Sequence, residues 1–98
     1  MIKSTYQCTL TLVVGDEELE VNVPNFETPY FVAMNKNGDV FMYNTMPARA
    51  GYDHNPIDCD KYMHIASVIE VDTSPYIDKC IEVGIFDSIV DFNKGIAQ

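Results

Sequence analysis

The sequence predicts a single α+β domain over residues 1–98, with an antiparallel sheet of about five strands and one or two C-terminal helices on one face. Two turn signals and one helix-start signal lead to this prediction. Gly15-Asp16 and Asn37-Gly38 each stand between two apolar runs, which is typical of β-hairpins. Ser74-Pro75 precedes an apolar stripe with helical spacing. A chain of 98 residues with 47% hydrophobic content can form one domain with one core.

The first predicted hairpin covers the alternating stretch from Thr5 to Pro24. Apolar residues occupy every second position up to Val14, as in a half-buried strand. A two-residue turn at Gly15-Asp16 pairs residues whose numbers sum to 31, and this places apolar residues opposite one another on one face. Those pairs are Leu12 with Leu19, Leu10 with Val21, and Cys8 with Val23. Pro24 ends the second strand because proline donates no ladder hydrogen bond.

The second predicted hairpin covers Tyr30 to Asn44. A type I′ turn at Asn37-Gly38 needs positive φ at both residues and pairs residues whose numbers sum to 75. The predicted pairs are Lys36 with Asp39, Met34 with Phe41, and Val32 with Tyr43. Apolar residues on both faces indicate that these two strands are central in the sheet and covered on both sides.

The remaining chain is predicted as a loop, a strand and helical segments. Residues 45–62 lack periodicity and contain two prolines, so they are expected to form a long irregular loop of the kind that often carries function. A fifth strand is predicted over Met63 to Val71. Ser74 as N-cap and Pro75 at the first helical position then predict a helix up to Gly84, followed by a second short helix. One helix bent at Gly84 is the alternative.

Charge and composition limit the partners and the location. Six basic and fifteen acidic residues give a net charge of −9, which disfavours direct binding to nucleic acid or to an anionic membrane. The expected partner is a basic protein, or a protein surface that normally holds nucleic acid. No apolar run approaches the roughly 20 residues of a spanning helix, and no secretory signal pattern is present, so a cytoplasmic location is expected. Three cysteines without repeated spacing predict reduced thiols.

The acidic residues fall into two groups that form the candidate partner-binding surface. One group surrounds the first turn, and the other makes ridges spaced i, i+4 outside the apolar stripe of the predicted helices. An acidic face docks on a basic protein with a charge complementarity that speeds the encounter. The candidate residues are Asp16, Glu17, Glu18, Glu20, Asp78, Glu82, Asp87 and Asp91. The alternative is that the charge serves solubility alone.

The 45–62 loop and its flanks suggest an alternative site for a nucleotide or another small anion. Arginine and lysine suit phosphate, and tyrosines offer faces on which a base can stack. The candidate ligand-binding residues are Arg49, Tyr52, His54, Lys61 and Tyr62.

The same region suggests a metal-dependent hydrolase as a third hypothesis. His54, Cys59 and His64, with Asp58 or Asp60 as a fourth ligand, are residue types that bind zinc, although their spacing is not a common zinc pattern. Carboxylates and histidine could also act as acid and base or hold Mg²⁺, and here they are Asp53, His54, Asp58 and Asp60. No nucleophile elbow, P-loop or paired metal motif accompanies them, so neither catalysis nor a cofactor is expected.

The second hairpin resembles a pattern in small uncharacterised bacteriophage proteins. The segments that carry the resemblance are Tyr30-Phe31-Val32-Ala33, Asn37-Gly38-Asp39-Val40-Phe41-Met42-Tyr43 and Pro47. This resemblance implies a phage origin and a place among inhibitors of host systems, including anti-CRISPR and other counter-defence proteins, acting in the host cytoplasm. The first function hypothesis is therefore a non-enzymatic inhibitor that binds a host protein through its acidic face and the 45–62 loop. A homodimer is an open alternative.

Overall fold

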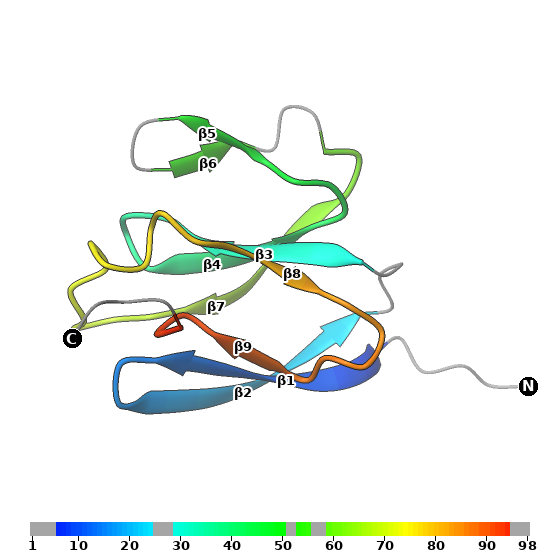
Figure 1. The fold of residues 1–98 in the computed structure, drawn as a ribbon, viewed down its shortest axis with the longest axis horizontal. Coiled ribbons are helices and arrows are strands. Elements are labelled where there is room, and N and C mark those ends of the chain that lie inside the picture. The colour runs from blue at the N-terminus through cyan, green and yellow to red at the C-terminus, as the bar shows by residue number, and fades with distance from the viewer. Residues whose placement is uncertain (1–5, 25–28, 51–52, 56–58, 95–98) are drawn as a thin grey trace, which may run out of the picture.

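The protein is an all-β structure in the part of the chain that the computed structural model describes, residues 6–24, 29–50, 53–55 and 59–94 (Figure 1). These ranges contain nine strands and no helix. Seven strands form two sheets of three and four strands, and the other two form a separate ribbon. The predicted α+β class is therefore wrong.

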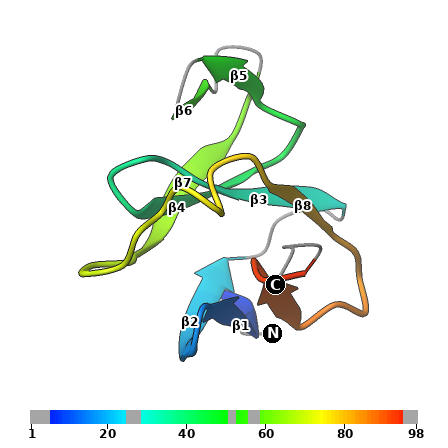
Figure 2. The same ribbon diagram turned by 60° about the vertical axis from the view of Figure 1, so that its left-hand side comes forward.

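The two sheets lie face to face as a sandwich (Figure 2). The three-stranded sheet has the order β2-β1-β9, and β9 runs parallel to β1. Its strands are β1 (Tyr6–Val14), β2 (Glu17–Pro24) and β9 (Ile89–Asp91). The four-stranded antiparallel sheet has the order β7-β4-β3-β8. Its strands are β3 (Tyr30–Met34), β4 (Asp39–Tyr43), β7 (Tyr62–Ser67) and β8 (Cys80–Val83).

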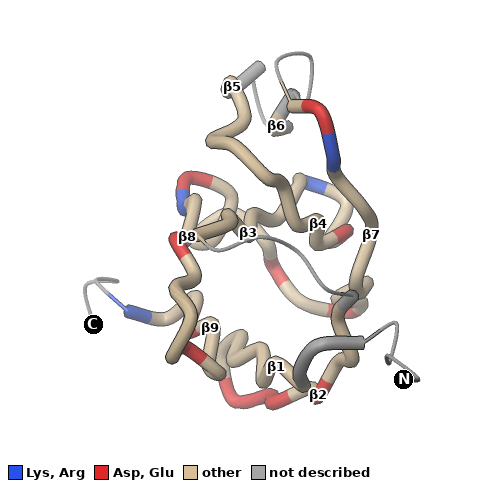
Figure 3. The backbone as a smooth tube through the Cα atoms, turned by 90° about the vertical axis from the view of Figure 1, so that its right-hand side faces the viewer, with Lys and Arg blue, Asp and Glu red and all other residues tan. Residues whose placement is uncertain are grey.

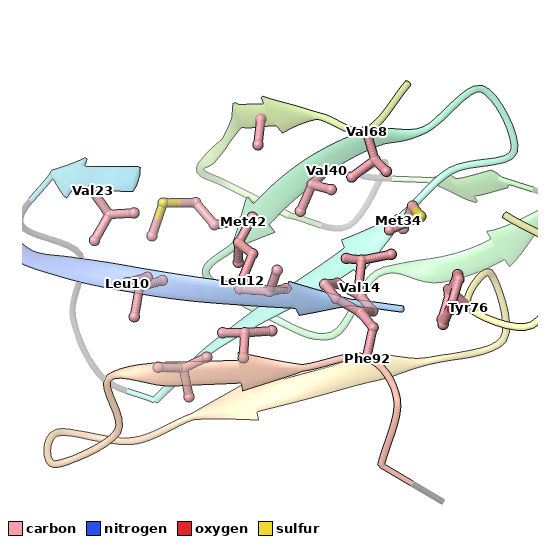
Figure 4. Packing of buried hydrophobic residues seen from close by; sticks show 14 of the residues in the cluster. Leu10, Leu12, Val14, Val23, Met34, Val40, Met42, Val68, Tyr76 and Phe92 are labelled. Atoms are coloured by element: carbon pink, nitrogen blue, oxygen red, sulfur yellow. The ribbon is translucent and has the colours of Figure 1, made fainter. Parts of the chain in front are cut away.

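The hydrophobic core fills the space between the two sheets (Figure 4). Alternate residues of each strand point into it, as expected where one face of a sheet is covered. The buried side chains include Leu10, Leu12, Val14, Val32, Met34, Val40, Met42, Val83, Val90 and Phe92. Burying one such side chain contributes about 1.5–3 kcal/mol, so the sandwich depends on this layer.

The β1–β2 hairpin has the predicted register. Leu12 pairs with Leu19 and Leu10 with Val21. Gly15 takes a φ of 60° in the turn, a conformation that costs glycine little because it has no Cβ. The alternation of this stretch and its tight turn therefore specified the pairing correctly.

The predicted register of the β3–β4 hairpin is wrong by one residue. Met34 pairs with Val40 and Val32 with Met42, so the numbers of paired residues sum to 74. The loop is longer than predicted because the amide of Gly38 donates to the carbonyl of Asn35 at 2.9 Å, and only Gly38 takes a positive φ there. This is a three-residue turn with a glycine bulge rather than a type I′ turn. The prediction that both strands are central in their sheet is confirmed.

The predicted C-terminal helices are replaced by a single turn at 74–78 followed by β8 and β9. The turn starts as a helix would, since the amides of Tyr76 and Ile77 both donate to the carbonyl of Thr73, at 2.9 and 3.2 Å. It does not propagate, because a short helix is marginal and the following residues are rich in β-branched and aromatic side chains. These residues instead supply edge partners, β8 for β3 and β9 for β1.

The region predicted as an irregular loop contains a two-stranded ribbon, β5 (Ala48–Ala50) with β6 (Asp53–Asn55). The ribbon lies on the side of the four-stranded sheet that faces away from the three-stranded sheet (Figures 1 and 2). The amide of His54 donates to the side-chain oxygen of Asn35 at 2.9 Å, which ties the ribbon to the end of β3. The predicted fifth strand is present as β7, and it ends at Ser67 rather than at Val71.

Candidate interaction surface

The sandwich has an open groove between the edge strands β8 and β9, which we call the β8–β9 groove. Its volume is about 830 Å³. The lining residues are Asp78, Lys79, Cys80, Ile81, Glu82, Asp87, Ile89, Asp91 and Lys94. Four carboxylates thus share one groove with two isoleucines and two lysines. Half of the predicted partner-binding residues meet here, although they lie on strands and turns rather than on helices.

Polar contacts hold several of these groove residues in place. The amide of Asn93 donates to the carboxylate of Asp91 at 2.9 Å. The ammonium group of Lys79 donates to the carbonyl of Lys94, which links the start of β8 to the turn after β9. These contacts hold Asp91 and Lys79 in place in a groove whose lining also includes Ile81 and Ile89.

A turn at residues 84–87 connects β8 to β9 and presents apolar side chains to solvent. The amide of Asp87 donates to the carbonyl of Gly84 at 3.2 Å, and the amide of Gly84 donates to the Asp87 carboxylate at 2.6 Å. Phe86 at the tip is 96% exposed, and Ile85 beside it is 71% exposed. Ile89, two residues after the turn, is 61% exposed and lines the groove. The turn is thus fastened at both ends while its largest side chain has almost no contact with the protein.

A second groove lies on the other side of the sandwich, between β2 and the chain after β7. Its volume is about 510 Å³, and Glu17, Glu18 and Glu70 line it together with exposed Leu19 and Ile69. Asp16 and Glu20 are exposed on the same hairpin. Figure 3 shows acidic positions along the β1–β2 hairpin and beside β8 and β9. The predicted acidic face is therefore two separate acidic regions, one on each open side of the sandwich.

The residues predicted to bind a nucleotide do not come together as one site in the described part of the chain. His54 is only 7% exposed, whereas Lys61 and Tyr62 are exposed on the surface. Tyr62 stacks on Tyr43, with ring centroids 6.4 Å apart, and Tyr43 stacks on Phe41 at 6.2 Å. The side chain of Arg49 and the whole of Tyr52 lie outside the described residues.

The predicted metal site is not assembled among the residues that the structure describes, where no three His, Cys, Asp or Glu side chains are grouped to hold an ion. His54 is buried, and the thiol of Cys59 contacts Thr45 instead. His64 contacts Ser67. Asp58 and the side chain of Asp53 lie outside the described residues.

A cluster of Asp39, Ser67 and His64 was not anticipated from the sequence. The Ser67 hydroxyl donates to Asp39 Oδ1 at 2.9 Å, and His64 Nε2 lies 3.0 Å from Ser67 Oγ and 3.3 Å from Asp39 Oδ1. In a catalytic triad the carboxylate holds one ring nitrogen and the serine proton goes to the other. Here both groups contact the same nitrogen, so the cluster lacks the geometry for nucleophilic catalysis. The pKa of Asp39 lies below its usual value of 3.8, chiefly because its carboxylate accepts the hydrogen bond from Ser67.

Two cysteine side chains, those of Cys59 and Cys80, lie in the described part of the chain. Cys59 and Cys80 are free thiols. Burial raises the pKa of the Cys80 thiol, which disfavours the reactive thiolate form. The side chain of Cys8 lies outside the described residues.

The apolar turn was missed because the sequence places Phe86 and Ile89 at helical spacing with residues that do reach the core. A usable signal was present in Gly84 and Asp87, which suit a tight turn, between two runs of β-branched residues. No helix in the described residues is long and apolar enough to cross a membrane. No protein-family model, curated protein or solved structure matches this chain.

Proposed function

We propose that this protein is a non-enzymatic inhibitor that docks on a basic surface of a host protein, as the resemblance to small phage proteins implies. The observation that carries the proposal is Phe86, 96% exposed at the tip of a fastened turn and flanked by the acidic β8–β9 groove. The acidic residues then act together with an apolar anchor. Such a role would place the protein in the cytoplasm of the host cell.

The energetics favour Phe86 as the anchor of a protein interface. Fully burying a phenylalanine side chain gains roughly 1.5–3 kcal/mol, and buried aromatic anchors supply much of the binding energy in many interfaces. The two hydrogen bonds across Gly84 and Asp87 hold the turn in one shape, so docking loses little conformational entropy. The neighbouring carboxylates, Glu82 and Asp91 among them, would steer a basic partner towards this turn.

Enzymatic activity is supported less well than binding. The Asp39, Ser67 and His64 cluster has the residue types of a hydrolase, but both partners contact one nitrogen of the imidazole ring. All three side chains also lie on an exposed part of the surface. Their contacts instead fasten the end of β7 to the start of β4.

The test is to capture partners from a bacterial lysate with the wild-type chain, identify the retained protein, and measure its affinity for purified variants. Phe86→Ala is expected to weaken binding at least tenfold, because it removes the anchor without touching the core. Ile69→Ala is the matched control, since Ile69 is 71% exposed in the other groove. The affinity should also fall steeply with salt. Equal affinities of Phe86→Ala and wild type would refute the assignment of this surface.

A second candidate function, binding of a nucleotide, is favoured by one observation. The rings of Phe41, Tyr43 and Tyr62 form a continuous stack that ends at the half-exposed Tyr62, beside Lys61. A base could extend this stack while the lysine contacts a phosphate. The test is an NMR titration with AMP, in which Tyr62→Ala should abolish shifts that Ile69→Ala, a variant of an exposed residue in the second groove, retains. If AMP shifts neither Tyr62 nor Tyr43, this candidate is excluded.

A further inference from the structure

We infer that the β8–β9 groove accepts an extended basic segment of the partner, which pairs with an open sheet edge as an additional strand. This inference rests on the proposed function and adds to it the form and chemistry of the bound segment. It concerns the groove itself, whereas the proposed function rests on the turn at 84–87.

Both strands that border the groove are edge strands. In the described residues, β8 has a ladder only with β3, and β9 has a ladder only with β1. The two strands lie side by side where the chain passes from one sheet to the other (Figures 1 and 4). An edge strand presents a row of backbone N–H and C=O groups to any chain that approaches it. The groove therefore lies beside two open strand edges, and one such edge is sufficient for a peptide to pair as an added strand.

The length of β8 limits the length of the added strand. β8 has four residues, which span about 13 Å at the usual rise per residue. An added strand that pairs along this edge would therefore contain about four to six residues. Such a short edge gives weak pairing by itself, so side-chain contacts must supply much of the affinity.

The side chains of the groove indicate a segment in which basic and apolar residues alternate. Ile81 and Ile89 provide apolar contacts, and four carboxylates outnumber the two lysines. Lys79 is already engaged with the carbonyl of Lys94. Because successive side chains of a strand point to opposite faces, an alternating segment can place its basic residues by the carboxylates and its apolar residues on the isoleucines.

A second copy of this chain is a poor occupant of the groove. The chain carries a net charge of −9, and pairing of two β8 edges would bring Glu82 and its acidic neighbours close to the same residues of the other copy. Like charges facing each other across a ladder are destabilising. The charge of the groove thus favours a basic segment over self-association.

Two synthetic peptides of equal charge test this inference with the full-length protein. One is an acetylated and amidated octapeptide of alternating lysine and valine, and the other replaces each valine with proline, which cannot donate a ladder hydrogen bond. Binding is measured by NMR titration at low salt. We expect the lysine-valine peptide to bind at least tenfold more tightly and to slow hydrogen exchange of β8 amides.

A pair of variants locates the binding. Ile89→Lys should weaken binding of the lysine-valine peptide at least fivefold, whereas Leu19→Lys, which adds the same charge in the other groove, should change it less than twofold. Equal affinity for the two peptides would overturn strand addition and leave the proposed acidic docking surface standing. If neither peptide binds, strand addition is overturned. If, in addition, Phe86→Ala binds the captured partner as tightly as wild type does, the proposed function is overturned as well.

Discussion

The two hairpins differ in what determines their register. Each has a turn glycine with positive φ, Gly15 at 60° and Gly38 at 91°, and each turn is contacted by a segment far along the chain. The β1–β2 turn has the predicted two residues, whereas the β3–β4 turn has three and its register moves by one. The amide side chain of Asn93 contacts the first turn, and the backbone of Val68 contacts the second.

We attribute this difference to the backbone of Val68, which approaches the second turn closely, whereas no backbone among the described residues approaches Gly15 in this way. The amide of Val68 donates to the carbonyl of Gly38 at 2.8 Å, and a Cβ on Gly38 would lie 2.0 Å from the carbonyl oxygen of Val68. This close approach requires glycine at the bulge position of a three-residue turn. A Cβ on Gly15 would have the Tyr76 hydroxyl as its nearest neighbour, at 3.4 Å, which is an ordinary contact. The first turn therefore follows its local sequence.

The largest expected effect comes from Gly38→Ala. The new Cβ would meet backbone that cannot move without breaking the contact between the turn and Val68, and the residue would keep an unfavourable φ. We expect a loss of about 3–5 kcal/mol in the free energy of unfolding, measured by urea denaturation. A loss no larger than that of Gly15→Ala would show that the two turns are equivalent and would remove the explanation of the register shift.

The next effect is expected from Asn93→Ala. The Asn93 side chain accepts from the amide of Gly15 and donates to its carbonyl, both at 2.8 Å, so the variant leaves two partly buried groups without these partners. We expect a loss of about 2 kcal/mol in the free energy of unfolding. Asn22→Ala is the control on the same hairpin, since it removes only an exposed contact with Thr9 and should cost under about 0.5 kcal/mol. Equal losses would mean that Asn93 does not fasten the turn.

A smaller effect is expected from Gly15→Ala. The substitution meets only an ordinary contact with Tyr76, so its cost is that of a left-handed conformation, about 1 kcal/mol. Gly15→Asn should cost less, because asparagine tolerates this region better than alanine. Thermal and urea unfolding of both variants provide the measurement. A loss as large as that of Gly38→Ala would contradict the proposed distinction between the turns.

The sequence was most informative where structure is local. Alternation up to Val14 identified a half-buried strand and its partner, and the apolar runs around Asn37-Gly38 identified two central strands. The C-terminal third was predicted wrongly because the start signal at Ser74-Pro75 gives one turn only, whose hydrogen bonds run to the carbonyl of Thr73. The strands after this turn form because β3 and β1 have open edges, and no local pattern in residues 80–91 shows that those edges need partners.

The residues of the candidate site were also predicted only in part, because their arrangement depends on segments that are distant in the sequence. Charge together with an assumed helical spacing singled out Asp78, Glu82, Asp87 and Asp91, and these residues do line one groove although they are not on helices. Phe86 falls in the segment predicted as the second short helix, and spacing cannot distinguish a core residue from an exposed one once the secondary structure is misassigned. The grouping of Asp39, Ser67 and His64 depends on the bulge in the β4–β7 ladder, which sets Phe41 opposite His64.

The smallest expected effect is a difference in pH dependence between the contacts that stabilise the two turns. The amide of Asn93 does not titrate, so its contribution should be independent of pH in the range where carboxyl groups titrate. Asp39 at the second turn accepts from Ser67, and this bond lowers its pKa from 3.8 in the folded state. A carboxyl group with a lowered folded-state pKa stabilises the fold above its unfolded pKa, and this stabilisation is lost as pH falls through the folded-state pKa.

Ser67→Ala should therefore raise the pKa of Asp39 towards 3.8, as measured by NMR titration of its carboxyl carbon. Its destabilisation relative to wild type should be present at pH 7 and should shrink as the pH falls through the folded-state pKa of Asp39, below which this carboxyl group is protonated in both states. Ser74→Ala is the matched control, because Ser74 lowers the pKa of Asp72 in the same way, at 2.8 Å from hydroxyl to carboxylate. It should shift the titration of Asp72 and leave that of Asp39 unchanged. If Ser67→Ala leaves the Asp39 titration unaltered, the bond to Ser67 is not what fastens the second turn, and the contact with Val68 alone distinguishes it from the first.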